Sequence, residues 1–414
     1  MQTTMTRPHG LPMQRRRFVA ALAAGAAAPP MSLSLSLSFA AQAAASDRRL
    51  VLVVLRGGLD GLAAVPAIGD PAFAEARGAL AQYPTAALPL TGPFALHPAL
   101  AQVHAMFGRG EAAVVHATGL PYRERSHFDA QQVLESGGSH PHQLLTGWLA
   151  RALASDQRRG IALNTAVPLV LRGPGQIDTW APSTMPEPTP DLVARLEQLY
   201  LADPALAQAL ARAKGLRGEP AMAANAASGM AGMAGGGGRG AAVALARKAA
   251  EFISAPGGPQ AAVLEMNGWD SHANQAAPNG ALSNNLGTLD AALATLRDTL
   301  SAPSAQGLWS RTVVLVVTEF GREVAANGTL GTDHGSGGAA LLLGGAVKGG
   351  QVIADWPGLA RADRFEGRDL RITTDLRAVF RTVLHEHLQL PLAAIDRDVF
   401  PGSAGLRRLE LLRG

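Results

Sequence analysis

The chain has 414 residues, of which 47% are hydrophobic and 16% charged, and it contains no cysteine. This composition is that of a globular protein with a sizeable core, and it excludes a disordered or collagen-like chain. Without cysteine the chain forms no disulfide, zinc–thiolate site or iron–sulfur cluster. Any chemistry therefore falls to His, Asp, Glu and Ser.

The formal net charge of +4 comes from the first 45 residues. They contain four arginines and no Asp or Glu, so the rest of the chain is close to neutral. A protein that binds nucleic acid needs an excess or a dense patch of Lys and Arg to meet the phosphates. No nucleic-acid partner is predicted.

Residues 1–45 have the features of an export signal. The basic stretch Arg15-Arg16-Arg17-Phe18 precedes an Ala-rich stretch, and small residues at 41–45 offer A-x-A cleavage sites. The paired arginines resemble a twin-arginine signal, so the twin-arginine export machinery is an expected partner. The alternative is an ordinary disordered basic N-terminus. No later segment approaches about 18 continuous apolar residues, so a mature protein without a transmembrane anchor is expected in the periplasm or outside the cell.

The mature chain alternates apolar runs with helical patterns. Strands are predicted at residues 49–55, 112–117, 167–171, 261–266, 311–317 and 339–343, where short apolar runs occur. Helices are predicted at residues 191–200, 204–215, 241–253, 282–300 and 374–388, where apolar residues recur at three- and four-residue spacing. This order predicts the α/β class, with a mostly parallel sheet covered by helices on both faces.

Residues 218–240 interrupt the alternation, because they contain little besides Ala, Gly, Met and Ser. Such a segment cannot bury enough apolar surface to become ordered, and a mobile surface loop is expected there. A domain boundary is the alternative. Helical patterns and polar motifs lie on both sides of the segment, so residues 46–414 are expected to form one domain.

Polar motifs follow several of the predicted strands, where ligands bind in an open parallel sheet. The side chains with metal-ligand chemistry in these motifs are Asp60, Asp270, His272, Glu319, Asp333 and His334. Each has a plain alternative, since an Asp between glycines suits a turn, an acidic residue suits a helix cap, and a lone His is more often packed than bound. Carboxylates and imidazoles together suit a divalent cation, so the cluster predicts a metal site.

Ser126 lies before a helical pattern that starts near Phe128. It is either the N-cap of that helix or a nucleophile that the helix N-terminus activates, and the two roles are compatible. The G-x-S-x-G elbow is absent, so a metal-free serine hydrolase would need an unusual pairing such as Ser126 with His334.

The motifs resemble, in order, those of the exported bacterial DUF1501 family. They are Arg56-Gly57-Gly58-Leu59-Asp60-Gly61, Arg125-Ser126-His127-Phe128-Asp129, Gly268-Trp269-Asp270-Ser271-His272, Thr318-Glu319-Phe320-Gly321-Arg322 and Gly331-Thr332-Asp333-His334-Gly335. That family looks like a branch of the alkaline phosphatase and sulfatase superfamily. The resemblance implies a three-layer α/β/α sandwich with a two-metal hydrolytic site.

The resemblance also implies roles for these residues. Ser126 would be the nucleophile, flanked by Arg125 and His127, while Asp60, Asp270, His272, Glu319, Asp333 and His334 would bind metal. The cation would be Zn²⁺, Ca²⁺, Mg²⁺ or Mn²⁺, and the substrate an anionic phosphate or sulfate ester. Phe320 replaces the His that the superfamily has beside its carboxylate, which keeps a second reading open: a non-catalytic envelope protein that binds a metal, an envelope polymer or another ligand.

Overall fold

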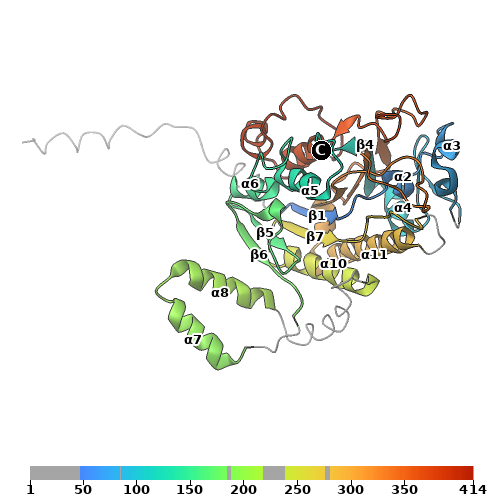
Figure 1. The fold of residues 1–414 in the computed structure, drawn as a ribbon. Coiled ribbons are helices and arrows are strands. Elements are labelled where there is room, and N and C mark those ends of the chain that lie inside the picture. Colours follow the sequence, from blue (N-terminus) through green and yellow to red (C-terminus); the bar gives the residue numbers. More distant parts are fainter. Residues whose placement is uncertain (1–46, 84, 184–187, 218–237, 276–279, 414) are drawn as a thin grey trace, which may run out of the picture. The chain divides into compact units, whose positions relative to one another are not determined.

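The core of the computed structural model is a sheet of nine strands, counted over the described residues 47–83, 85–183, 188–217, 238–275 and 280–413 (Figure 1). The strand order is β10-β4-β9-β8-β1-β7-β5-β6, and β11 pairs with β4. The strands are β1 Arg49–Leu55, β4 Ala112–Gly119, β5 Arg159–Ala162, β6 Gln176–Thr179, β7 Ala261–Met266, β8 Thr312–Thr318, β9 Gly338–Leu343, β10 Gln351–Ile353 and β11 Thr374–Asp375. A separate two-stranded sheet joins β2 Leu88–Pro89 to β3 Ala95–Leu96.

Most neighbouring strands of the large sheet run parallel. The central strand β1 pairs in parallel with β7 on one side and β8 on the other. Within the large sheet, among the described residues, only β9 runs antiparallel to its neighbours, β4 and β8. The predicted α/β class with a mostly parallel sheet is therefore confirmed.

Helices cover the sheet on both faces. The α-helices are α2 Gly61–Ala64, α3 Phe73–Arg77, α4 Ala101–Gly108, α5 His127–Ser136, α6 Trp148–Ala154, α7 Pro190–Tyr200, α8 Pro204–Arg217, α10 Arg239–Ser254, α11 Ala281–Ser301, α12 Leu376–Thr382 and α13 Leu392–Ala394. Short 3₁₀-helices span Gly78–Ala81, Leu169–Leu171, Pro303–Ala305 and Leu308–Arg311. Short π-helices span Val383–His387 and Ile395–Val399.

Two apolar clusters lie on opposite faces of the sheet. In β1, Val51, Val53 and Leu55 belong to the cluster that packs under α4, α10 and α11. The alternate residues Leu50, Leu52 and Val54 belong to the cluster under α5, α6 and α12. Because successive side chains of a strand point to opposite faces, one continuous apolar run fills both clusters. The result is the predicted three-layer arrangement.

One predicted strand is wrong. Residues 169–171 form a 3₁₀ turn, whose N-cap is Pro168. Val170 and Leu171 are apolar because they are buried in the cluster with α6, not because they extend the sheet. The strands on either side of this turn, β5 and β6, carry too few apolar residues to stand out in the sequence.

Two sequence-based expectations fall outside the described residues. The export signal at residues 1–45 is one, and the loop expected at residues 218–240 lies there up to residue 237. The last residues of that loop are described, and α10 already begins at Arg239. Within the described part of the chain, no helix is both long and apolar enough to span a membrane.

Candidate metal centre

The polar motifs gather at one edge of the sheet. The strands β1, β7 and β8 are parallel neighbours and end at Leu55, Met266 and Thr318, so the segments after them emerge together. His334 precedes β9, which runs antiparallel to β8 and therefore starts where β8 ends. Chain segments far apart in sequence meet here because of the strand order.

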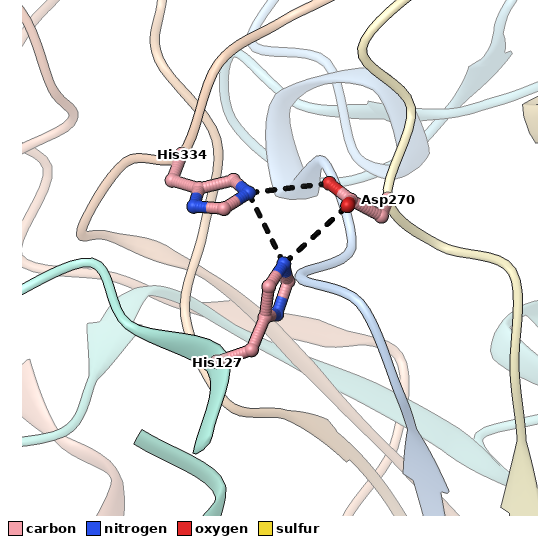
Figure 2. Close-up of side chains that lie close together, drawn as sticks. All are labelled: His127, Asp270 and His334. Atoms are coloured by element: carbon pink, nitrogen blue, oxygen red, sulfur yellow. Dashed lines mark hydrogen bonds and ion pairs between the residues drawn. The ribbon is translucent and has the colours of Figure 1, made fainter. Parts of the chain in front are cut away.

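Three of these side chains form a compact cluster, shown in Figure 2. The Nε2 atoms of His127 and His334 lie 3.1 Å apart. Asp270 places Oδ2 3.5 Å from His127 Nε2 and Oδ1 3.3 Å from His334 Nε2. One donor atom from each residue lies within 4.8 Å of the other two, as in a metal site. His127 is the first residue of α5, and Asp270 and His334 lie in loops.

The outer nitrogens of the two rings are held by acceptors. His127 Nδ1 lies 2.9 Å from Glu319 Oε1, and His334 Nδ1 lies 3.0 Å from the carbonyl oxygen of Arg125. A carbonyl oxygen can only accept a hydrogen bond, so His334 Nδ1 carries the hydrogen. In a neutral ring the Nε2 atom then carries a lone pair and no hydrogen. Metal-binding histidines are usually oriented in this way, by a hydrogen bond from the second ring nitrogen to a carboxylate or a carbonyl oxygen.

The facing Nε2 atoms need a positive partner between them. Burial lowers the pKa of His334, which favours the neutral ring. The hydrogen bond with Glu319 raises the pKa of His127. Two neutral rings with both Nδ1 atoms donating would direct lone pairs at each other across 3.1 Å. A proton on His127 or a metal ion relieves that repulsion, so the residues present fit a cation.

His272 extends the cluster, because it contacts both His334 and Asp270. Its Nε2 lies 3.0 Å from His334 Nε2 and 3.0 Å from Asp270 Oδ1. Its Nδ1 lies 3.0 Å from Asp333 Oδ1, and the hydrogen bond from Asn327, followed by that from His272, lowers the pKa of Asp333. Asp333 therefore contacts the Nδ1 atom of His272, as Glu319 contacts the Nδ1 atom of His127.

Arg322 holds Asp270 in its ionised form. The arginine is 1% exposed, and its Nη1 donates to Asp270 Oδ1 at 2.6 Å. Burial acts to raise the pKa of Asp270, but the hydrogen bond and charge of Arg322 outweigh it, and the pKa falls below its usual value. An ionised carboxylate is thus favoured beside the two rings.

Glu319 is buried behind His127, and its predicted role as a metal ligand stays a prediction. It is 1% exposed, and its Oε1 accepts from Gly57 N at 2.9 Å and from Gln131 Nε2 at 3.0 Å, besides contacting His127. Burial acts to raise the pKa of Glu319, but the bonds from His127 and Gln131 hold it below its usual value. Gly57 has φ +121°, and a Cβ there would lie 2.6 Å from Asp270 N, so only glycine fits between Glu319 and Asp270.

Asp60 lies in a buried hydrogen-bond network that reaches the cluster only through other side chains. It is 1% exposed, its Oδ2 accepts from Arg77 Nη2 at 2.6 Å and from Gln275 Nε2, and its Oδ1 caps α2 through Ala63 N. From Gln275 the network continues through Thr332 to Arg322 and so reaches Asp270. The structure therefore joins Asp60 to the cluster through hydrogen bonds, and its role as a ligand stays a prediction.

Ser126 is the N-cap of α5, since its Oγ accepts from Asp129 N at 3.5 Å. The cap predicted from the sequence is present, and the nucleophile role stays a prediction. Arg125 pairs with Asp369 at 3.0 Å and with Glu366 at 2.6 Å. Arg56 pairs with Glu135 and Glu265.

Sequence reasoning missed the residues that support the cluster. Gln131 lies one helical turn after His127, so its place on the same face of α5 follows from helix spacing. Arg77, Gln275 and Thr332 carry no such signal, because only the folded loops bring them to Asp60 and Arg322.

Residues 95–396 match the family described as "Protein of unknown function (DUF1501)". The chain belongs to the DUF1501 family. The matched part of this DUF1501 chain contains His127, Asp270 and His334, whereas Asp60 and Arg77 lie before it. None of the curated proteins matches the sequence.

Several solved structures share a distant likeness with the DUF1501 chain. A phosphonate monoester hydrolase of Agrobacterium radiobacter has 11% identity, with 87% of this chain and 79% of that one covered, at a TM-score of 0.41. A sulfatase from Pseudoalteromonas sp. has 13% identity, coverage of 88% and 74%, and a TM-score of 0.39. The C-terminal periplasmic domain of EcEptC from Escherichia coli, in complex with zinc, has 10% identity, coverage of 72% and 73%, and a TM-score of 0.35.

Proposed function

We propose that the chain is a metal-dependent hydrolase of phosphate or sulfate esters, with His127, Asp270 and His334 as ligands of a divalent cation. The observation that supports it best is the pair of Nε2 atoms 3.1 Å apart, each on a ring whose Nδ1 contacts a buried carboxylate or a carbonyl oxygen. His272, whose Nε2 also lies 3.0 Å from His334 Nε2, would extend the ligand set.

The donor set favours some cations over others. Imidazole nitrogen suits Zn²⁺ and, less strongly, Mn²⁺, whereas Ca²⁺ and Mg²⁺ prefer oxygen ligands throughout. We therefore propose Zn²⁺ first. When bound, such a cation polarises an ester oxygen and lowers the pKa of water.

The residues of the chain orient the site. Glu319 and the Arg125 carbonyl fix the two rings, and Arg322 keeps Asp270 charged. Ser126 directly precedes His127 at the N-terminus of α5, where free N–H groups favour an anionic oxygen, and we propose it as the nucleophile. In the described part of the chain its Oγ bonds Asp129 N and no histidine, which argues against a metal-free pairing with His334.

A second function is favoured by the arginines. Arg56, Arg125 and Arg322 are each paired with a carboxylate. An anionic ester would have to compete with these carboxylates for a cationic side chain. This competition supports a non-catalytic protein that binds a metal or an envelope polymer.

The proposed location is the periplasm or the exterior, reached by twin-arginine export. The support is the sequence of residues 1–45 alone. Export of folded proteins by this route is compatible with a metal that is bound before transport.

Metal analysis of the purified full-length chain tests the proposal. We expect stoichiometric Zn²⁺ or Mn²⁺, which His127→Ala and Asp270→Ala abolish, while His140→Ala, a change at an exposed histidine outside the cluster, leaves the content unchanged. A chain that binds none of the four divalent cations contradicts the hydrolase.

A panel of phosphate and sulfate esters separates the two functions. For a hydrolase we expect turnover that Ser126→Ala abolishes while metal content is retained. A metal-loaded chain that is inert on the whole panel, yet retains an envelope polymer, supports the second function instead.

A further inference from the structure

Asp369 is a buried carboxylate that contacts the chain segments next to His334. It lies between β10 and β11 and is 0% exposed. Its Oδ2 accepts hydrogen bonds from Arg125 Nε at 3.0 Å and from Ser336 Oγ at 2.8 Å, and its Oδ1 accepts from Arg368 Nε at 2.8 Å. A carboxylate that is removed from water needs donors of this kind, and these three side chains supply them.

The donors to Asp369 restrain both the ring and the backbone of His334. The carbonyl oxygen of Arg125 lies 3.0 Å from His334 Nδ1 and accepts its hydrogen. Arg368 Nη2 donates to the carbonyl oxygen of His334, and Ser336 follows His334 by two residues. Asp369 therefore joins the acceptor of the ring N–H to the backbone of the residue that carries the ring.

This link matters because Arg125 and His334 are 209 residues apart in the sequence. Tertiary contacts must therefore set the distance between the Arg125 carbonyl oxygen and the ring. An arginine that is anchored at Nε has a restrained backbone, so the bond to Asp369 also restrains that carbonyl group. Because one carboxylate binds both segments, it fixes their separation.

We propose that Asp369 is a positioning residue for His334. By holding its three donors in place, it keeps the Arg125 carbonyl oxygen in front of Nδ1, so the ring hydrogen stays there and Nε2 keeps its lone pair. That Nε2 atom faces the other members of the cluster (Figure 2). The binding of a cation by this lone pair rests on the proposed function, whereas the choice of tautomer does not.

Asp369→Asn tests the proposal, because it keeps the shape of the side chain. Each carboxylate oxygen accepts from an arginine, so the NH₂ group of the amide meets an N–H of Arg125 or Arg368 whichever way it turns. Glu366→Gln is the matched control. Glu366 also pairs with Arg125, at 2.6 Å, but its side chain is 57% exposed, and in the described part of the chain its carboxylate bonds no other side chain.

Long-range ¹H–¹⁵N NMR correlations at pH 8 show which nitrogen of each ring carries hydrogen in the chelator-treated, ¹⁵N-histidine-labelled full-length chain. The His334 signals are assigned by their loss in His334→Gln. We expect Nδ1–H in the wild-type chain and in Glu366→Gln, and a mixture of both tautomers in Asp369→Asn. A purely structural role would lower the thermal transition of Asp369→Asn and leave the tautomer unchanged, which would overturn the proposal.

Zinc affinity, measured by competition with a chromophoric chelator, is the second readout. Asp369→Asn should weaken it about 10-fold, as expected for loss of a support behind a metal-binding histidine, while Glu366→Gln should keep the wild-type value. Asp396→Asn, which breaks a pair with Arg381, shows what a lost ion pair does to the fold alone. Equal losses of affinity in Asp396→Asn and Asp369→Asn would overturn the proposal.

Arg368→Gln replaces Asp369→Asn if that variant does not fold. The side chain of Arg368 is 35% exposed, so its loss disturbs the core less, and it contacts both Asp369 and the His334 carbonyl oxygen. We expect the same mixture of tautomers. A wild-type His334 signature in folded Arg368→Gln contradicts the positioning role.

The two readouts keep this inference distinct from the proposed function. If the chain binds zinc through His334 and Asp369→Asn leaves both readouts unchanged, the positioning role fails and the proposed function stands. If Asp369→Asn alters the tautomer but the wild-type chain binds no divalent cation, the proposed function fails and the positioning of the ring stands.

Discussion

At the scale of single residues, Glu319 decides whether His127 can serve as a ligand. The carboxylate is buried and contacts His127 Nδ1 at 2.9 Å, which leaves Nε2 to face His334 and Asp270. A support of this kind holds the ring orientation and raises the basicity of the ligand nitrogen.

Glu319→Gln is therefore expected to weaken metal binding about 10- to 100-fold, because the neutral amide is a poorer partner for Nδ1–H. The measurement is competition with a chromophoric zinc chelator at fixed pH. Asp333→Asn, the corresponding change behind the exposed His272, is the comparison and should have a smaller effect. Equal affinities for Glu319→Gln and the wild-type chain would rule out this role.

At the scale of elements, strands that are buried on both faces were readable from the sequence. The runs at Arg49–Leu55 and Ala261–Met266 match β1 and β7 at both ends, because all positions but one in each run are apolar. Short strands such as β5 and the antiparallel course of β9 were not readable, since pairing with distant strands decides them.

The site was readable only in part for the same reason. Motifs after parallel strands meet at one edge, so Asp270 and His334 could be expected near each other. The sequence interpretation set His127 beside the nucleophile and Glu319 among the ligands, and both roles stay predictions. The structure adds that His127 Nε2 faces the cluster and that Glu319 contacts His127 Nδ1 from behind. Which ring nitrogen faces the cluster depends on side-chain directions, and these cannot be derived from the spacing of residues in the sequence.

The buried pair of Asp60 and Arg77 links the segment after β1 to α3, and it tests whether Asp60 is a ligand. Removing one charge of a buried pair leaves the other uncompensated, which typically costs about 3–5 kcal/mol. Asp60→Asn should therefore lower the free energy of unfolding, measured in urea, whether or not Asp60 also binds metal. The double change Asp60→Asn with Arg77→Met should recover part of that loss. Loss of metal from a folded Asp60→Asn chain would instead show that Asp60 is a ligand.

At the scale of the whole molecule, histidines buried in both layers make the fold sensitive to acid. His116 packs on Phe94 in one layer and is fully buried, and His387 is 2% exposed on the other side of the sheet. Their Nε2 atoms contact the carbonyl oxygens of Val65 and Arg49 at 2.8 Å. Burial lowers the pKa of each ring to about 4.

Stability should therefore fall as the pH drops from 7 to 5. The unfolded chain takes up protons near the ordinary pKa of 6.5, while the folded chain resists protonation until about pH 4, so the stability contributed by a neutral buried ring is complete above 6.5 and is lost between those values. The loss approaches about 3 kcal/mol per ring at its limit. Urea unfolding of the chelator-treated chain at a series of pH values measures it. His116→Gln keeps a donor and an acceptor but does not titrate, so this variant should be less stable at pH 7 and show a shallower slope. An unchanged slope in that variant would mean that His116 is not one of the groups responsible.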